Sequence, residues 1–413
     1  MKYLRQPIFI IGILFSVFGL VTWLGSVLIP YLRIACQLNN FSSYLVAFSL
    51  YISYTVMALP AAAVLKRTGY KKGMALGLLI MTAGTLCFIP AAMSRWYVLF
   101  LFGLFIQGTG MAILQTAANP YVTILGPLES AARRMSIMGI CNGIAGVIGP
   151  LALGSVILND ADGIREKVAR MASSEKVIEL ERLAHRAILP YGIIALALLG
   201  LGVWIYYSGL PELHDEADGV NEADIHHRKT SIFQFPHLLL GVLTLFLYVG
   251  VEVIAGDTII SYGTSQGFRM STARFFNSCT LAGMLAGYLL GIVLIPKYLS
   301  HTRVLKISSL MGLAFGLAAL FTQGGVSVAF VALLGLANSM VWPSIWPLAI
   351  QGLGRFTRIG SSLLILAIGG GALLPMLYGW MADHFSPQQA YWIVVPCYCF
   401  IGYYAVYGHK ARA

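Results

Sequence analysis

The sequence predicts an all-α membrane protein whose twelve transmembrane helices form two pseudo-symmetric six-helix bundles. Of the 413 residues, 58% are hydrophobic and only 10% are charged, against roughly 25% charged residues in an ordinary soluble domain. Apolar stretches of about 20 residues, long enough to cross the hydrocarbon layer as helices, recur along the whole chain. In addition, one segment of the first half resembles a segment in the corresponding place of the second half. Lipid is therefore the expected solvent.

Charge clusters, glycines and prolines divide the apolar stretches into individual spans. The expected spans are 7–30, 41–65, 73–93, 96–124, 134–158, 187–208, 236–262, 272–296, 303–322, 327–351, 358–380 and 388–408. The first one follows Lys2 and Arg5, and its length and the lack of a small-residue cleavage site favour a retained helix over a signal peptide. The segment 159–186 mixes acids with bases and predicts a short amphipathic or solvated helix outside the membrane.

The net charge of +11 reflects membrane topology better than it reflects a nucleic-acid partner. Most lysines and arginines fall in short loops on one side of the predicted spans, which places both termini in the cytoplasm of a bacterial inner membrane. The cysteines and histidines show no metal-site spacing, so we expect no metal, no cofactor and no disulfide framework. The expected partners are the bilayer and a small molecule, and the chain is expected to act as a monomer.

An acidic linker, residues 209–235, divides the chain into two predicted domains, 1–208 and 236–413. Aligning 133–154 with 358–379 matches residues in the fifth span of each half. The matched pairs are Arg133 with Arg358, Ser136 with Ser361, Ile140 with Ile365, Gly146 with Gly371, Pro150 with Pro375 and Gly154 with Gly379. Two repeated halves are typical of transporters that rock about a midplane site and expose it to each side in turn.

Two acids, Glu252 and Asp257, lie deep in the seventh span. A charged side chain costs about 2.5–3.5 kcal/mol in the middle of a membrane, so each is a candidate ion-coupling residue. The two lie about 140° apart around a straight helix and should not share a face. For Asp257 an ion pair with Arg269 or Arg274 at an outer gate is the alternative.

Polar side chains recur at helical spacing on three spans and predict the lining of a sugar site. Amides supply hydrogen bonds to hydroxyls, and indoles offer a flat apolar surface to a sugar ring. The alternative is that these amides and tryptophans only hold helices together. With one asparagine of the fifth span added, the predicted substrate-binding residues are Gln107, Gln115, Asn119, Asn142, Tyr248, Asn338, Trp342 and Trp346.

Four motifs carry a resemblance to a known family. LQTAANPYVTILGP at 114–127 resembles the fourth-helix signature of the fucose–galactose–glucose symporter family of the major facilitator superfamily. The segments FLYVGVEVIAGDTIISYG, NSMVWPSIWPLAIQGLG and GSSLLILAIGGGALLP fit the same family. The resemblance implies the major facilitator fold and, in place of an enzymatic activity, sugar uptake that is usually coupled to a proton.

The sequence departs from the fucose branch of this family at two acidic positions. The resemblance places Ser26 and Gln115 where fucose permeases have an aspartate and a glutamate, and neither can titrate. Glu252 resembles the glucose/galactose branch, which implies glucose, galactose or a related hexose as cargo. A proton is the expected coupling ion, and sodium coupling or uncoupled transport stays open. A drug or metabolite exporter and a membrane sugar sensor are the remaining alternatives.

Overall fold

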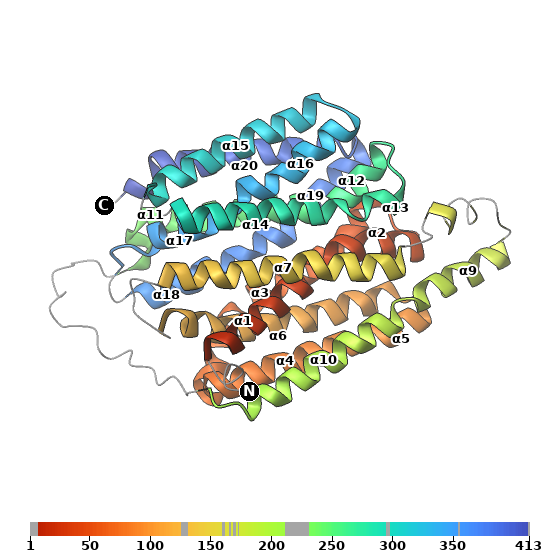
Figure 1. Ribbon diagram of the computed structural model, residues 1–413, viewed down its shortest axis with the longest axis horizontal. Coiled ribbons are helices and arrows are strands. Elements are labelled where there is room, and N and C mark those ends of the chain that lie inside the picture. The colour runs from red at the N-terminus through yellow and green to blue at the C-terminus, as the bar shows by residue number, and fades with distance from the viewer. Residues whose placement is uncertain are drawn as a thin grey trace.

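The computed structural model describes residues 7–124, 131–158, 162–164, 167, 171, 173–210, 231–294, 298–353 and 356–411. Within this part of the chain, 12 helical segments are long and apolar enough to cross a membrane. Each overlaps one of the expected spans, so the predicted all-α, twelve-span architecture is confirmed. The long helices lie roughly side by side along one direction of the molecule (Figure 1).

Several spans consist of two helices separated by a short break. Before the linker the helices are α1 (Pro7–Trp23), α2 (Gly25–Ala35), α3 (Asn40–Thr68), α4 (Tyr70–Leu86), α5 (Phe88–Ser94), α6 (Tyr97–Ile124), α7 (Ala131–Ile157), α9 (Ser173–His185) and α10 (Ile188–Tyr206). After it they are α11 (Pro236–Asp257), α12 (Ile259–Ser265), α13 (Met270–Ala273), α14 (Phe276–Leu294), α15 (His301–Phe321), α16 (Gly324–Asn338), α17 (Val341–Ile350), α18 (Thr357–Leu366), α19 (Gly370–His384) and α20 (Val394–Val406), with short 3₁₀ turns η4 (Ile232–Gln234), η6 (Ala367–Gly369), η7 (Gln389–Ile393) and η8 (Gly408–Lys410).

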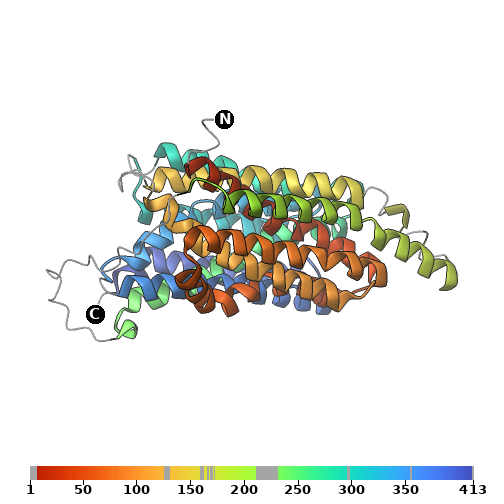
Figure 2. The ribbon, with the colours of Figure 1, turned by 90° about the horizontal axis from the view of Figure 1, so that it is seen from below.

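The bundle has two distinct ends. At one, the start of α11 lies beside the last described residues, because the amide of His237 donates to the carbonyl of Ala411 at 3.1 Å. We name this the terminal end. At the opposite end α9 projects beyond the other helices (Figures 1 and 2), and the hydroxyl of Tyr31 on α2 donates to the carbonyl of Ala184 at 2.8 Å. We name this the α9 end; α9 itself is the helix expected within 159–186.

The helices before and after the linker meet along two matching pairs, α7 on α14 and α19 on α3. These pairs contain the two repeated segments, since 133–154 lies on α7 and 358–379 lies on α18, η6 and α19. The repeat found in the sequence therefore supplies one interface helix to each half. Most of the predicted linker, 211–230, lies outside the described residues, so the domain boundaries at 208 and 236 stay a prediction.

Gly370 is required by the close approach of α19 to α11. A Cβ at Gly370 would lie 1.8 Å from the carbonyl oxygen of Phe246, which is backbone and unable to move aside. We expect Gly370→Ala to destabilise the protein by about 1–3 kcal/mol, the usual cost of overpacking, and to lower its melting temperature in detergent. Gly192→Ala is the matched control, because nothing lies within 4 Å of a Cβ there. Equal melting temperatures for the two variants would contradict this prediction.

Candidate functional site

Glu252 lies well inside the bundle. The helix α11 opens with Pro236, whose missing N–H costs nothing at the first helical position, and runs unbroken to Asp257. At 1.5 Å per residue Glu252 is about 24 Å from the start of α11. Its half-buried carboxylate accepts a hydrogen bond from the hydroxyl of Tyr248, one turn earlier, at 2.7 Å. The partner of this acid is therefore a phenol and not a base.

Three further tyrosines lie within electrostatic range of this carboxylate. Glu252 is close enough to interact electrostatically with Tyr51 of α3, Tyr288 of α14 and Tyr398 of α20. Because Tyr51 comes from the other half, Glu252 faces the interface between the halves. These tyrosines were missed in the sequence. Their position in the middle of apolar spans was the available signal, since a buried tyrosine hydroxyl needs a partner.

Asn338 lies at a break in the tenth span. It is the last residue of α16, and α17 begins three residues later with Pro343 in its first turn. The hydroxyl of Tyr398 donates to Asn338 Oδ1 at 2.8 Å. The side chain is 0% exposed, and within the described structure its Nδ2 has no hydrogen-bond acceptor. Broken helices at the membrane midplane commonly form substrate sites. The Nδ2 group of Asn338 can donate hydrogen bonds to a substrate at such a break.

The two tryptophans of α17 form a single aromatic surface. The rings of Trp342 and Trp346 are stacked, with centroids 5.6 Å apart and planes 23° apart. Both side chains are half-buried, and α17 packs against α11 and α15. The structure therefore brings together the indoles that the sequence assigned to a sugar ring.

The N-terminal half contributes Gln115 on α6 and Asn142 on α7, both half-buried. At the level of Asn142 the helices α1 and α7 nearly touch, since a Cβ at Gly19 would lie 1.9 Å from the carbonyl oxygen of Asn142. Asn119 is on α6, and its side chain lies outside the described part of the structure.

Gln107 lies in the packing between α4 and α6. Its side-chain amide donates to Thr85 Oγ1 on α4 at 2.8 Å, and the residue is buried. Successive residues at i+4 drift by about 40° around a helix, so Gln107 and Gln115 are about 80° apart. The polar side chains predicted on the fourth span therefore do not all lie on one face of the helix. Gln107 fits the helix-packing alternative, and we leave it out of the proposed site.

Asp257, the last residue of α11, is buried inside the protein. It is 2% exposed, and a Cβ at Gly25 of α2 would lie 2.9 Å from its Oδ2. Its Oδ1 has no hydrogen-bond partner among the described residues. The alternative, an ion pair of Asp257 with Arg269 or Arg274, is not formed among the described residues. Arg269 instead interacts with Asp162, and Arg274 donates to the backbone carbonyl of Gly154.

On the α9 side of Glu252 the two halves are in contact. The ring of Trp23 lies 2.3 Å from a Cβ placed on Gly256 and clusters with apolar residues of α14. Ser26 accepts a hydrogen bond from Asn277 Nδ2 of α14 at 2.8 Å. The position at which the resemblance implied an acid thus carries a serine bonded across the interface. The helices α11 and α12 also pack against α2. The structure is closed at this end.

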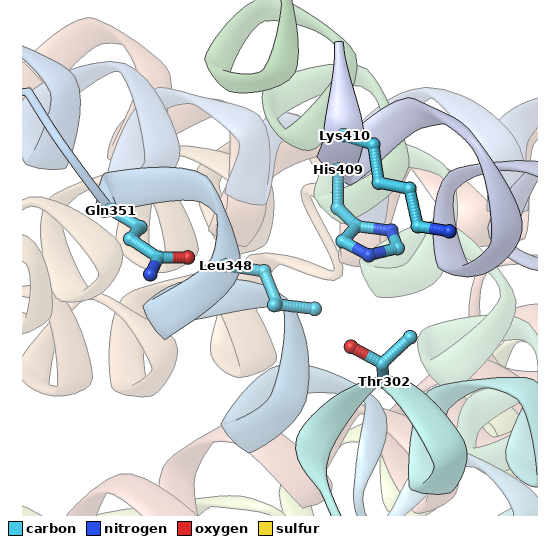
Figure 3. A pocket seen from close by; sticks show the side chains of 5 residues that line it. All are labelled: Thr302, Leu348, Gln351, His409 and Lys410. Atoms are coloured by element: carbon cyan, nitrogen blue, oxygen red, sulfur yellow. The ribbon is translucent and has the colours of Figure 1, made fainter. Parts of the chain in front are cut away.

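A separate pocket of about 460 Å³ lies at the terminal end, within the C-terminal half (Figure 3). The side chains of Thr302, Leu348 and His409 point toward one another there, with Gln351 and Lys410 at the rim (Figure 3). None of the predicted site residues lines it. Among the described residues there is also no group of three or more histidines, cysteines or acids that could hold a metal ion.

Two helical halves related by a repeat, with a membrane-buried carboxylate facing the interface between them, define a membrane transporter of the alternating-access class. The chain belongs to the Major Facilitator Superfamily, whose family model matches residues 9–363. It is accordingly a membrane-spanning transporter and not an enzyme.

Named relatives cover nearly the whole chain. The chain is 32% identical over 402 residues to a glucose/galactose transporter of Brucella abortus biovar 1 (strain 9-941), covering 97% of this chain and 93% of that protein. It is 29% identical over 384 residues to an L-fucose-proton symporter of Escherichia coli (strain K12), covering 91% and 87%. A crystal structure of the superfamily transporter FucP in the outward conformation matches with a TM-score of 0.74 and 27% identity, covering 97% of this chain and 98% of that one.

Proposed function

We propose that this protein imports a hexose-type sugar, glucose or galactose or a close relative, together with a proton. The observation that carries the proposal is Glu252, a carboxylate inside the membrane that faces the other half and is bonded to a phenol. The names of the relatives, a glucose/galactose transporter and a fucose–proton symporter, support the same cargo and ion.

Glu252 couples the proton to the sugar. A charged carboxylate is costly in a closed, dehydrated site, whereas the protonated acid is neutral. The halves therefore rock with Glu252 protonated and sugar bound, and proton and sugar leave when the site opens to the cytoplasm. The empty protein then returns with Glu252 charged and bonded to Tyr248, and Glu252 takes up the next proton from outside. Tyr248 donates a hydrogen bond to the charged form and stabilises it while water is present. Neither Ser26 nor Gln115 can take over this role, because neither titrates.

The sugar lies between the amides and the indole surface. Asn338 offers the N–H groups of Nδ2 to hydroxyl oxygens, and the stacked Trp342 and Trp346 cover an apolar ring face. Gln115 and Asn142 add contacts from the other half. A sugar bound in this way contacts both halves at once.

The topology proposed from the positive charges assigns the cellular sides. The terminal end faces the cytoplasm and the α9 end faces outward across a bacterial inner membrane. Residues 1–208 and 236–413 move as two units joined by the linker 209–235, and the monomer is the transporting unit.

The function is tested by uptake into vesicles that contain the purified protein. Counterflow of a panel of labelled hexoses identifies the cargo, and an imposed pH gradient or sodium gradient identifies the ion. We expect glucose or galactose to exchange, and an inward proton gradient to drive accumulation without sodium. Accumulation that requires sodium, or exchange with no response to either gradient, would refute proton symport, and hexose-independent transport of drugs would refute sugar import.

Replacing Gln115 by Ala is expected to weaken sugar binding by about 1–3 kcal/mol, or about 5- to 150-fold, because a hydroxyl of the sugar loses its buried partner. Binding to the purified variant is measured by calorimetry. Gln107→Ala is the control within the same helix, since its amide is bonded to Thr85 and its loss should leave affinity unchanged. Unaltered affinity in a folded Gln115→Ala variant would remove Gln115 from the site.

A further inference from the structure

At the α9 end two aspartates each bind the start of a helix that belongs to the opposite half. Asp383, near the end of α19, accepts hydrogen bonds from the backbone amides of Asn40 at 3.0 Å and Phe41 at 2.8 Å, the first two residues of α3. Asp162, which follows α7, accepts from the backbone amides of Met270 at 2.7 Å and Ser271 at 3.1 Å, the first two residues of α13. Both carboxylates thus join the halves.

The two contacts occupy equivalent places in the topology of the two halves, although the alignment of the repeat does not match position 162 with position 383. In each case the acid follows the fifth span of one half, and the amides begin the second span of the other. The first amides of a helix lack partners within it, so a carboxylate there is favoured. On α3, which has 29 residues, the partial positive charge of the helix start favours it further. On α3 the backbone amide of Ser42 donates to the side chain of Asn39 at 2.8 Å. Asp383 accepts from the two backbone amides that precede it. Arg269, the residue just before α13, makes no side-chain hydrogen bond to the start of that helix. Asp162 accepts the hydrogen bonds of the first two amides instead.

The helices that precede or carry these acids also touch the opposite half nearby. A Cβ at Gly379 would lie 3.1 Å from the carbonyl oxygen of Asn40. The carbonyl oxygen of Gly154, matched to Gly379 in the repeat, accepts a hydrogen bond from Arg274 at 3.5 Å. The acids therefore sit on the two helix pairs, α19 with α3 and α7 with α14, that slide against each other when the halves rock.

We propose that Asp162 and Asp383 are two symmetric clasps that hold the α9 end closed and must release in every transport cycle. Opening this end separates each acid from its amides, which then return to water. The clasps are positioning residues, because they set the balance between the two conformations without touching the cargo. The inference rests on alternating access and is independent of the sugar and of the coupling ion.

Replacing either aspartate by asparagine removes the charge and one accepting oxygen while keeping the size. Asparagine can still accept one of the two hydrogen bonds, so the variant loses the other bond and the negative charge at the helix start, which together change an equilibrium by about 2- to 10-fold. We expect each single variant to raise the ratio of open to closed molecules at the α9 end by such a factor. The two effects should multiply in the double variant, because the clasps share no partner.

The ratio is measured by electron–electron double resonance between spin labels at Ser94 and Gln323, exposed positions at the α9 end of the two halves, after replacement of the native cysteines. Purified protein is used without sugar or gradient, so failure here is distinct from failure of the proposed function. The matched control is Glu181→Gln, which neutralises an exposed acid of α9 at the same end.

A longer-distance population that grows in Asp162→Asn and Asp383→Asn, and not in the control, supports the clasps. Distance distributions that match the parent in both variants would overturn them. Growth in the control as well would also overturn them, because charge at this end would then act without any specific contact. Asp383 is exposed, so the Asp383→Asn variant decides the matter by itself if the Asp162 variant does not purify as a monodisperse protein.

Discussion

Glu252→Gln is expected to abolish concentrative sugar uptake while leaving counterflow exchange intact. An amide resembles the protonated acid in shape and in lacking charge, so the loaded halves should still rock. The variant has no proton to release, and a proton gradient can no longer drive the cycle. We expect accumulation to fall to the level of simple equilibration, with exchange kept within about threefold of the parent, since binding contacts outside the carboxylate are unchanged.

Both activities are measured on the same vesicles, with counterflow at equal pH and uptake under an inward proton gradient. The control is Glu181→Gln on α9, which changes an acid far from Tyr248 and should behave as the parent. If Glu252→Gln still accumulates sugar against its gradient, Glu252 is not the coupling residue. Asp257, buried against Gly25, is then the next carboxylate to substitute.

Asn338→Ala is expected to weaken sugar binding by about 1–3 kcal/mol, or about 5- to 150-fold. The variant loses the N–H donors of Nδ2 and also leaves the hydroxyl of Tyr398 without its acceptor. Tyr398→Phe separates the two effects, because it removes only the bond that orients Asn338. We expect Tyr398→Phe to have the smaller effect, and the double variant to bind about as weakly as Asn338→Ala alone.

The affinities are measured by calorimetry at one pH, and folding is checked by melting temperature. Effects of the two substitutions that simply add would mean that Tyr398 does not act through Asn338. Parental affinity in a folded Asn338→Ala variant would show that the break in the tenth span lies outside the sugar site.

The span pattern was predictable because it depends on chemistry that is local in the sequence. Runs of apolar residues must be helical in lipid, since every backbone amide and carbonyl has to be bonded within the segment. The repeat between 133–154 and 358–379 was also visible, because both segments face the same requirement for close packing at the interface. The break after Asn338 had its signal in Pro343 and Pro347.

The partners of the acids were not predictable from spacing. Glu252 and Tyr248 are one turn apart and were placed together in the sequence, whereas Tyr51, Tyr288 and Tyr398 come within electrostatic range of the same carboxylate from three other helices. Gln107 looked equivalent to Gln115 by spacing, yet it is bonded to α4. The rotation of α6 against its neighbours decides which amide is free, and that rotation depends on packing between helices.

The sequence by itself determined that this chain spans the membrane twelve times, that its halves are repeated and that Glu252 lies deep in the seventh span, because hydrophobic length, internal similarity and charge are properties of the chain. Only the tertiary structure decided that Asp257 is buried against Gly25, that Ser26 bonds Asn277 across the interface, and that two aspartates cap helices of the opposite half. The residues in each of these contacts lie on different spans far apart in sequence, so their meeting depends on how the two halves dock, and in a transporter that docking changes with conformation.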